Sequence, residues 1–448
     1  MGLVAGLGFA GYDEFESVFS TWAIAHGQMA CAFPSGFKVT APLYPLVSGG
    51  IAAASHIGHT VPFPARDLMG PHCDRAFLVI NSWSIRSGAL TPTLKISYLS
   101  WFALLVGAVV LLRATGKGRC RWEPAALLII ASLPPVWTCL QTTFHPEDVL
   151  AMGFILAALG CVFRGSWAVA GLLIGLAFLS QQYALLVAVP LLVLAPPQRR
   201  LAYGGSAAAT VAIMAVVLVI VSGTSAAHAI FLGTGNTGGV GGTVLWELGL
   251  HGAPLLLLSR IVPLALAATI AWWAVKRLGS ASLEPIALLS LVAVSLSLRL
   301  VFEQQLFLYY FMALSVSLVL LDVVRGHIRG SLVAWLVVMP AIYLDQIAVP
   351  ESLGKVIPVI TIVIAALVLS ALVLKGGPRR ELAPWIAVVV AALVAWDKTN
   401  VLGTPPTWFW QVVLVIPGVV LAARPLLETV SGSMLPRYPN RPTVSTVG

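Results

Sequence analysis

Long apolar segments recur along the chain and constrain its fold more than any other feature. Stretches such as 95–113, 201–222 and 356–375 carry charges only at their ends. A bilayer core needs about 20 mostly apolar residues per helix, and it offers no water to pair the backbone. The composition agrees, with 59% hydrophobic residues, 10% charged residues and a mean hydropathy of +0.94. We therefore expect an all-α fold, a polytopic transmembrane helical bundle of about 12–14 spans.

The segment 167–195 is too long for a single span. Gln181, Gln182 and Tyr183 interrupt it, so we predict two helices that meet at a polar break. Residues 1–12 are too few to cross a bilayer, and we interpret them as the end of a first span. The predicted spans are 95–113, 125–141, 148–164, two within 167–195, 201–222, 254–275, 283–299, 309–324, 331–347, 356–375, 384–396 and 407–424.

Basic residues predict the orientation of the bundle. Short loops rich in Lys and Arg stay in the cytoplasm, and the loops with Arg121, Arg200, Arg277 and Arg380 fall on one side. The net charge of +9 therefore reflects topology and affinity for membrane lipids, and no nucleic-acid partner is expected. We predict a multi-pass protein of the plasma (inner) membrane. Its single transmembrane domain, 1–424, would include a first extracytoplasmic loop at 13–94 and a second at 142–148, before a disordered cytoplasmic tail at 425–448.

The first extracytoplasmic loop opens on three carboxylates, Asp13, Glu14 and Glu16. Apolar stretches further along this loop predict helices that lie in the membrane interface. Asp13 is a candidate general base, although Asp13 with Glu16 also fits a helix-capping box. Cys31 and Cys73 lie in the same loop, where an oxidising compartment would permit a disulfide without requiring one.

The second extracytoplasmic loop holds His145, Glu147 and Asp148 within four positions. Pro146 suits the first turn of a helix, and carboxylates there complement the helix dipole. A cap explains Asp148 but explains neither His145 nor Glu147. A metal would need a second ligand set that the sequence does not offer, so we expect no metal.

Two arginines stand near the ends of apolar helices. Arg260 lies about two turns into its span, and intramembrane charge by default faces the bundle interior and marks a functional site. We therefore expect Arg260 to contact a lipid phosphate, or alternatively to form an interhelical salt bridge. Arg299 could bind the same phosphate, or pair with Glu303 at the end of its helix.

Together these features resemble the GT-C superfamily, membrane glycosyltransferases that use polyprenyl-phosphate sugars. "DEFESVFSTWAIA" resembles the first-loop segment of the dolichol-phosphate-glucose-dependent enzymes of asparagine-linked glycan assembly, and "FHPEDVLAMGF" is similar to their second loop. "GLLIGLAFLSQQYALLVAVPLLVL" resembles the broken helix pair of bacterial members, many of which have a lysine near the position of Gln181 or Gln182.

The resemblance implies an inverting transfer from a polyprenyl-phosphate sugar donor to a glycan or glycolipid acceptor of the cell envelope. Mannose is the sugar we expect, and the reaction needs no metal or other cofactor. The catalytic residues would be Asp13, Glu16, His145 and Asp148. A secondary transporter or flippase, a lipid-linked oligosaccharide ligase and a noncatalytic scaffold are the alternatives. The substrate-binding residues would be Glu14, Glu147, Gln181, Gln182, Tyr183, Arg260, Arg299, Glu303 and Tyr309.

Overall fold

A computed structural model describes residues 12–33, 41–55, 60–70, 73, 75–115, 122–223, 230, 243–303, 308–326, 411 and 415–432. Within these ranges every regular element is a helix. Five of the helices are long and apolar enough to cross a membrane, which confirms the predicted all-α polytopic bundle. They are α5 (Leu90–Ala114), α8 (Pro146–Phe163), α11 (Pro197–Ser222), α14 (Gly252–Leu278) with η6 (Gly279–Leu283), and α15 (Pro285–Phe302).

The remaining apolar helices are shorter or bent. The predicted span 125–141 is bent by 49° between α6 (Glu123–Ser132) and the following α7 (Pro134–Trp137) and η4 (Thr138–Thr142). The predicted polar break is confirmed, because α9 (Trp167–Ser180) ends before Gln181 and η5 (Gln182–Ala184) leads into α10 (Leu185–Leu194). The predicted span 309–324 corresponds to η7 (Leu308–Tyr310) and α16 (Phe311–Val324).

The C-terminal predictions are covered only in part. The predicted spans 331–347, 356–375 and 384–396 lie outside the described residues. Helix α22 (Ile416–Val430) continues beyond residue 424, where the last span was predicted to end and the tail to begin.

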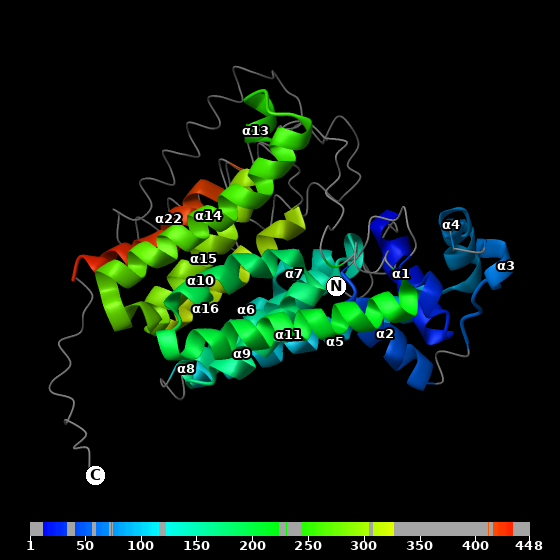
Figure 1. The fold of residues 1–448 in the computed structure, drawn as a ribbon, viewed down its shortest axis with the longest axis horizontal. Helices are drawn as coiled ribbons and strands as arrows, with labels where there is room; N and C mark the ends of the chain where they lie inside the picture. The colour runs from blue at the N-terminus through cyan, green and yellow to red at the C-terminus, as the bar shows by residue number, and fades with distance from the viewer. Residues whose placement is uncertain are drawn as a thin grey trace, which may run out of the picture.

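The segment before α5 folds into helices around a second apolar core, to which side chains of α5, α8, α9 and α11 also contribute. These helices are α1 (Tyr12–Ala25), η2 (Met29–Cys31), α2 (Leu43–Ala54), α3 (Arg66–Met69) and α4 (Ala76–Ser87), which lie together at one end of the molecule (blue in Figure 1). Phe19, Trp22 and Tyr44 are almost fully buried among them. A disulfide joins Cys31 to Cys73, so the pairing that the sequence left open is formed. Helix α5 begins at Leu90, slightly before the predicted end of the loop at 94.

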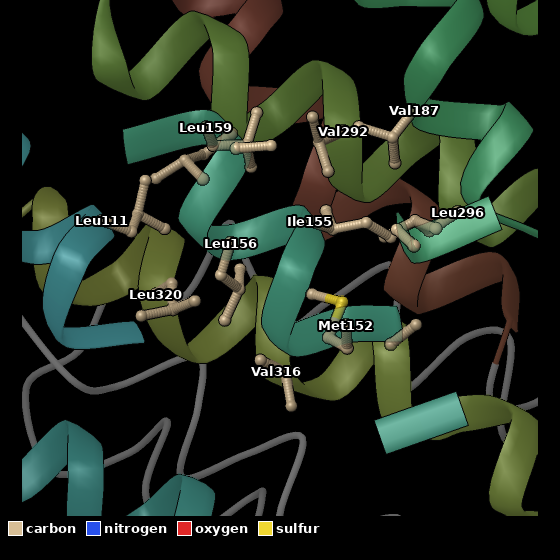
Figure 2. Packing of buried hydrophobic residues seen from close by; sticks show 14 of the residues in the cluster. Leu111, Met152, Ile155, Leu156, Leu159, Val187, Val292, Leu296, Val316 and Leu320 are labelled. Carbon is tan, nitrogen blue, oxygen red and sulfur yellow. The ribbon is translucent and has the colours of Figure 1, made fainter. Parts of the chain in front are cut away.

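Nearly all side chains of helix α8 are buried, so this helix lies inside the bundle. It packs against α5 on one side and α9 on another. Figure 2 shows its Met152, Ile155, Leu156 and Leu159 pointing into a cluster with side chains of α5, α10, α15 and α16. Apolar packing of this kind holds the N-terminal turn of α8 in a fixed position.

Glycine lets α5 and α8 approach closely. A Cβ added at Gly153 would come within 2.8 Å of the backbone of Ala103, and one added at Gly107 would collide with the carbonyl of Gly153. Small residues at helix crossings are how membrane helices bring their backbones together. The α5–α8 contact therefore depends on these two glycines.

Candidate functional site

The chain enters α8 through an unusual backbone path. Helix η4 is a π-helical turn, and Phe144 follows it with φ at +53°. Positive φ is rare for a bulky residue, so the surroundings must hold it there. The Phe144 side chain is fully buried and packs edge to face against Tyr44 of α2, with ring centroids 6.2 Å apart. This path delivers His145 to the N-cap of α8 and places Glu147 and Asp148 in its first turn.

Asp148 is held by three residues from other parts of the chain, Gln181, Tyr183 and Arg299. Its Oδ2 accepts a hydrogen bond from Nε2 of Gln181 at 3.3 Å, and its Oδ1 lies 3.6 Å from Nη1 of Arg299. The Gln181 amide is itself oriented, because its oxygen accepts the N–H of Gln182 at 3.0 Å. The Tyr183 hydroxyl donates to the backbone carbonyl of Asp148 at 2.8 Å. The polar break between α9 and α10 therefore positions Asp148.

Arg299 lies one turn before the end of α15 and is fixed on several sides. Its Nε donates to Glu303 at 3.2 Å, as the sequence predicted for one of its two roles. Its guanidinium carbon lies 4.0 Å from the centroid of the Tyr310 ring and 5.3 Å from that of Tyr183. Stacking on aromatic faces and pairing with carboxylates is the environment that suits arginine in a partly buried place.

His145 and Glu147 form a second pair beside Asp148. Nδ1 of His145 lies 3.0 Å from Oε1 of Glu147, and the imidazole stacks on Tyr309 with centroids 4.4 Å apart and planes 17° apart. Glu147 is only 2% exposed, so it is not a solvated cap. We call His145, Glu147, Asp148, Arg299 and Glu303 the charged cluster.

Three members of the charged cluster lie close enough to hold a cation. His145, Glu147 and Asp148 each offer one ligand atom within 4.8 Å of the others. Gln181 and Arg299 already face the two Asp148 oxygens, and Oε1 of Glu147 pairs with His145. A nearby guanidinium opposes a second positive charge. Hydrogen bonds and ion pairs thus engage both Asp148 oxygens, Oε1 of Glu147 and Nδ1 of His145, whereas Oε2 of Glu147 has no hydrogen-bond partner among the described residues. The expectation that this site needs no metal stays a prediction.

Other predicted site residues lie outside the charged cluster. Gln182 donates from its side chain to the carbonyl of Ile230 at 3.2 Å. The side chain of Arg260 is exposed on α14, whereas the sequence predicted that it faces the bundle interior. This orientation differs because α14 has apolar residues all round and therefore no stripe that predicts its buried face. Its contact with a phosphate stays a prediction.

Asp13, Glu14 and Glu16 lie in the first turns of α1, and their side chains lie outside the described residues. Their predicted roles therefore stay predictions. Two aromatic residues of the site were missed, Tyr310 and Phe144. The tyrosine pair at 309–310, ten residues beyond Arg299, was the available signal for Tyr310, whereas nothing local marks Phe144 as a residue with positive φ.

The helices and the charged cluster define a polytopic membrane protein with a preorganised polar site where α8 begins and α15 ends. Residues 90–302 match the model of glycosyltransferase family 87. The match runs from the start of α5 to the end of α15 and covers a little under half of the chain. It indicates a membrane glycosyltransferase. No curated protein and no solved structure matches the chain.

Proposed function

We propose that this protein transfers a sugar, with mannose as the first choice, from a polyprenyl-phosphate donor to an envelope glycan or glycolipid. The reaction would take place at the extracytoplasmic face of the plasma membrane. The family match over 90–302 supports the transferase class. The basic residues between the spans support the orientation, because short basic loops stay in the cytoplasm.

Arg299 is the observation that carries the proposal. A guanidinium has five N–H donors, and among the described residues its Nε faces the carboxylate of Glu303 and its Nη1 that of Asp148. The Tyr310 ring holds its plane before any ligand arrives. Donors fixed where negative charge develops stabilise a transition state without a cost of reorganisation. A leaving polyprenyl phosphate develops such charge when the bond to the sugar breaks.

The other half of the reaction needs a base for the acceptor hydroxyl. Asp13 is our candidate, in the first turn of α1 and next to the start of the outer segment. A single carboxylate base gives direct displacement and inversion at the sugar carbon. The charge on the phosphate would be met by arginine, so we propose a reaction that needs no metal.

The test is transfer by the purified protein in lipid nanodiscs. Radiolabelled polyprenyl-phosphate mannose, and separately polyprenyl-phosphate arabinose, would be supplied with envelope lipid acceptors. We expect one donor to label an acceptor and Arg299→Gln to reduce turnover about 100-fold or more. Arg113→Gln is the control, because Arg113 lies in the last turn of α5, its side chain is 68% exposed, and it pairs with Glu123 of α6.

Equal turnover in Arg299→Gln and wild type would remove Arg299 from the site. Movement of lipid-linked sugar across the bilayer without transfer would favour a flippase instead. Donor affinity measured for Arg260→Gln in the same nanodiscs would decide the predicted role of Arg260. We expect this substitution to weaken donor binding.

A further inference from the structure

Glu147 is buried beside His145 in the first turn of α8. The sequence assigned Glu147 to substrate binding; the side chain is 2% exposed, and its Oε1 lies 3.0 Å from Nδ1 of His145. Its Oε2 is also buried and has no hydrogen-bond partner. Burying a carboxylate is costly unless a charged partner compensates it. The imidazole is the partner nearest to it.

The charges around the ring favour a protonated imidazole. The charged cluster holds three carboxylates, those of Glu147, Asp148 and Glu303, against the single guanidinium of Arg299. A proton on His145 reduces this excess of negative charge among side chains that are mostly buried. Among the described residues, the groups that contact the ring are Glu147 and Tyr309. Further titratable and charged groups contact or lie near these two or one another: Asp148 of α8, Cys139 of η4, Tyr183 of η5, Arg299 of α15, Glu303 after it, Tyr310 of η7 and Tyr44 of α2.

The stack on Tyr309 favours the same state. The two rings are nearly parallel, and their centroids are 4.4 Å apart. A cation over an aromatic face gains attraction from the ring quadrupole, and this gain grows where water is excluded. The pair with Glu147 and the stack with Tyr309 also fix the direction of the ring. Since Oε1 of Glu147 faces Nδ1, Nε2 is the ring nitrogen directed away from Glu147, and it is buried.

We infer that His145 works as a protonated hydrogen-bond donor whose Nε2–H binds the phosphate of the lipid-linked substrate, and that Glu147 is the positioning residue that keeps it protonated and oriented. This inference rests on the proposed function. In the transfer, the acceptor oxygen forms a bond to the sugar carbon and its proton goes to the carboxylate base. The bond between the sugar carbon and the phosphate oxygen breaks, and its electron pair stays on that oxygen. Nε2–H and Arg299 then share the second negative charge of the leaving phosphate.

The pH dependence of turnover tests the pairing of His145 with Glu147. If the active ring is protonated, turnover falls as pH rises through the titration of His145. Glu147→Gln removes the charge that favours the proton, so this fall should move to lower pH by about one unit. Turnover of Glu147→Gln should then be about tenfold below wild type at pH 8 and close to wild type at pH 5.5. Glu284→Gln is the control, because Glu284 is exposed at the opposite end of α15, and its profile should match wild type.

A loss of turnover in Glu147→Gln that is equal at all pH values would overturn the inference, because a merely structural role would produce it. A second measurement needs no transfer. The probe is polyprenyl phosphate without sugar, and its own phosphate titrates at about pH 6 in every variant, so the comparison is with His145→Gln. From pH 5.5 to pH 8 the affinity of wild type should fall relative to that of His145→Gln, and in Glu147→Gln this relative fall should begin at lower pH. A ratio of wild-type to His145→Gln affinity that stays constant with pH would also overturn the inference.

The two ideas fail in different ways. If no lipid-phosphate sugar is transferred but polyprenyl phosphate binds with the expected pH dependence, the proposed function fails and the phosphate-binding pair stands. If transfer occurs and Glu147→Gln shifts no profile, the proposed function stands and this inference fails. Nitrogen NMR of histidine-labelled protein, with His145→Gln to assign the signal, would show the same shift of the ring titration directly.

Discussion

The contact between Asp148 and Arg299 makes a quantitative prediction about stability. The two side chains come from α8 and α15, and their exposed fractions are only 4% and 18%. Removing one partner of a buried ion pair costs about 3–5 kcal/mol, because the other charge is left without compensation. Because Arg299 is still partly exposed, we expect Arg299→Gln to lower the free energy of unfolding by about 3 kcal/mol, near the lower end of this range.

Asp148→Asn should cost less, about 2 kcal/mol, since Glu303 still pairs with Arg299. The double variant leaves neither charge unpaired across this contact. Its cost should therefore be smaller than the sum of the single costs by about 1–2 kcal/mol, which is the coupling energy of the pair.

Unfolding in mixed micelles with increasing SDS, followed by tryptophan fluorescence, would measure the four proteins of this cycle. Arg113 and Glu123 provide the matched control, a pair 3.5 Å apart whose arginine is 68% exposed. An exposed pair should show a coupling below about 0.5 kcal/mol. Additive costs for Asp148 and Arg299, or a coupling no larger than that of the exposed pair, would refute the argument from burial.

Three further predictions concern other parts of the chain. Asp13→Asn should fold and bind donor normally yet lose at least about 100-fold in turnover, because Asn replaces a cap but not a base; full activity in the transfer assay would reassign the base. Gly153→Leu should separate α5 from α8 and reduce the yield of folded protein in size-exclusion chromatography, whereas Gly50→Leu, where a Cβ meets open space, should not. Replacing Cys31 and Cys73 together by Ser should lower the stability of the outer segment by about 4 kcal/mol for a separation of 42 residues. Limited proteolysis of this segment should be faster in the double-Ser variant than in wild type, and equal rates of cleavage would contradict the prediction.

Helices and their break were predictable because local composition determines them. Apolar length predicted α5, α8, α11, α14 and α15, and three polar residues predicted the break at Gln181. The pair between Arg299 and Glu303 was equally local, since residues four apart share a helix face. The contact between Arg299 and Asp148 was not predictable in the same way, because 151 positions separate them and only tertiary packing brings them together.

Burial was the second property that local pattern could not supply. Both Arg260 and Arg299 are single charges near the end of an apolar helix, and the sequence favoured Arg260 because it lies deeper. The structure buries Arg299 against tyrosines and leaves Arg260 exposed. A uniformly apolar helix carries no periodic stripe, so depth along the helix can be read from the sequence but the face cannot.

The path into α8 connects the helices before α5 to the charged cluster. A π-helical turn and a phenylalanine with positive φ stand within the eight residues before Pro146, and both conformations are costly unless packing imposes them. The packing comes from Tyr44 of α2, which lies outside the region that matches family 87. The backbone that places His145 therefore depends on a helix that the family match does not cover. We therefore expect Tyr44→Ala, which changes no charge of the cluster, to alter the position of His145 through its contact with Phe144.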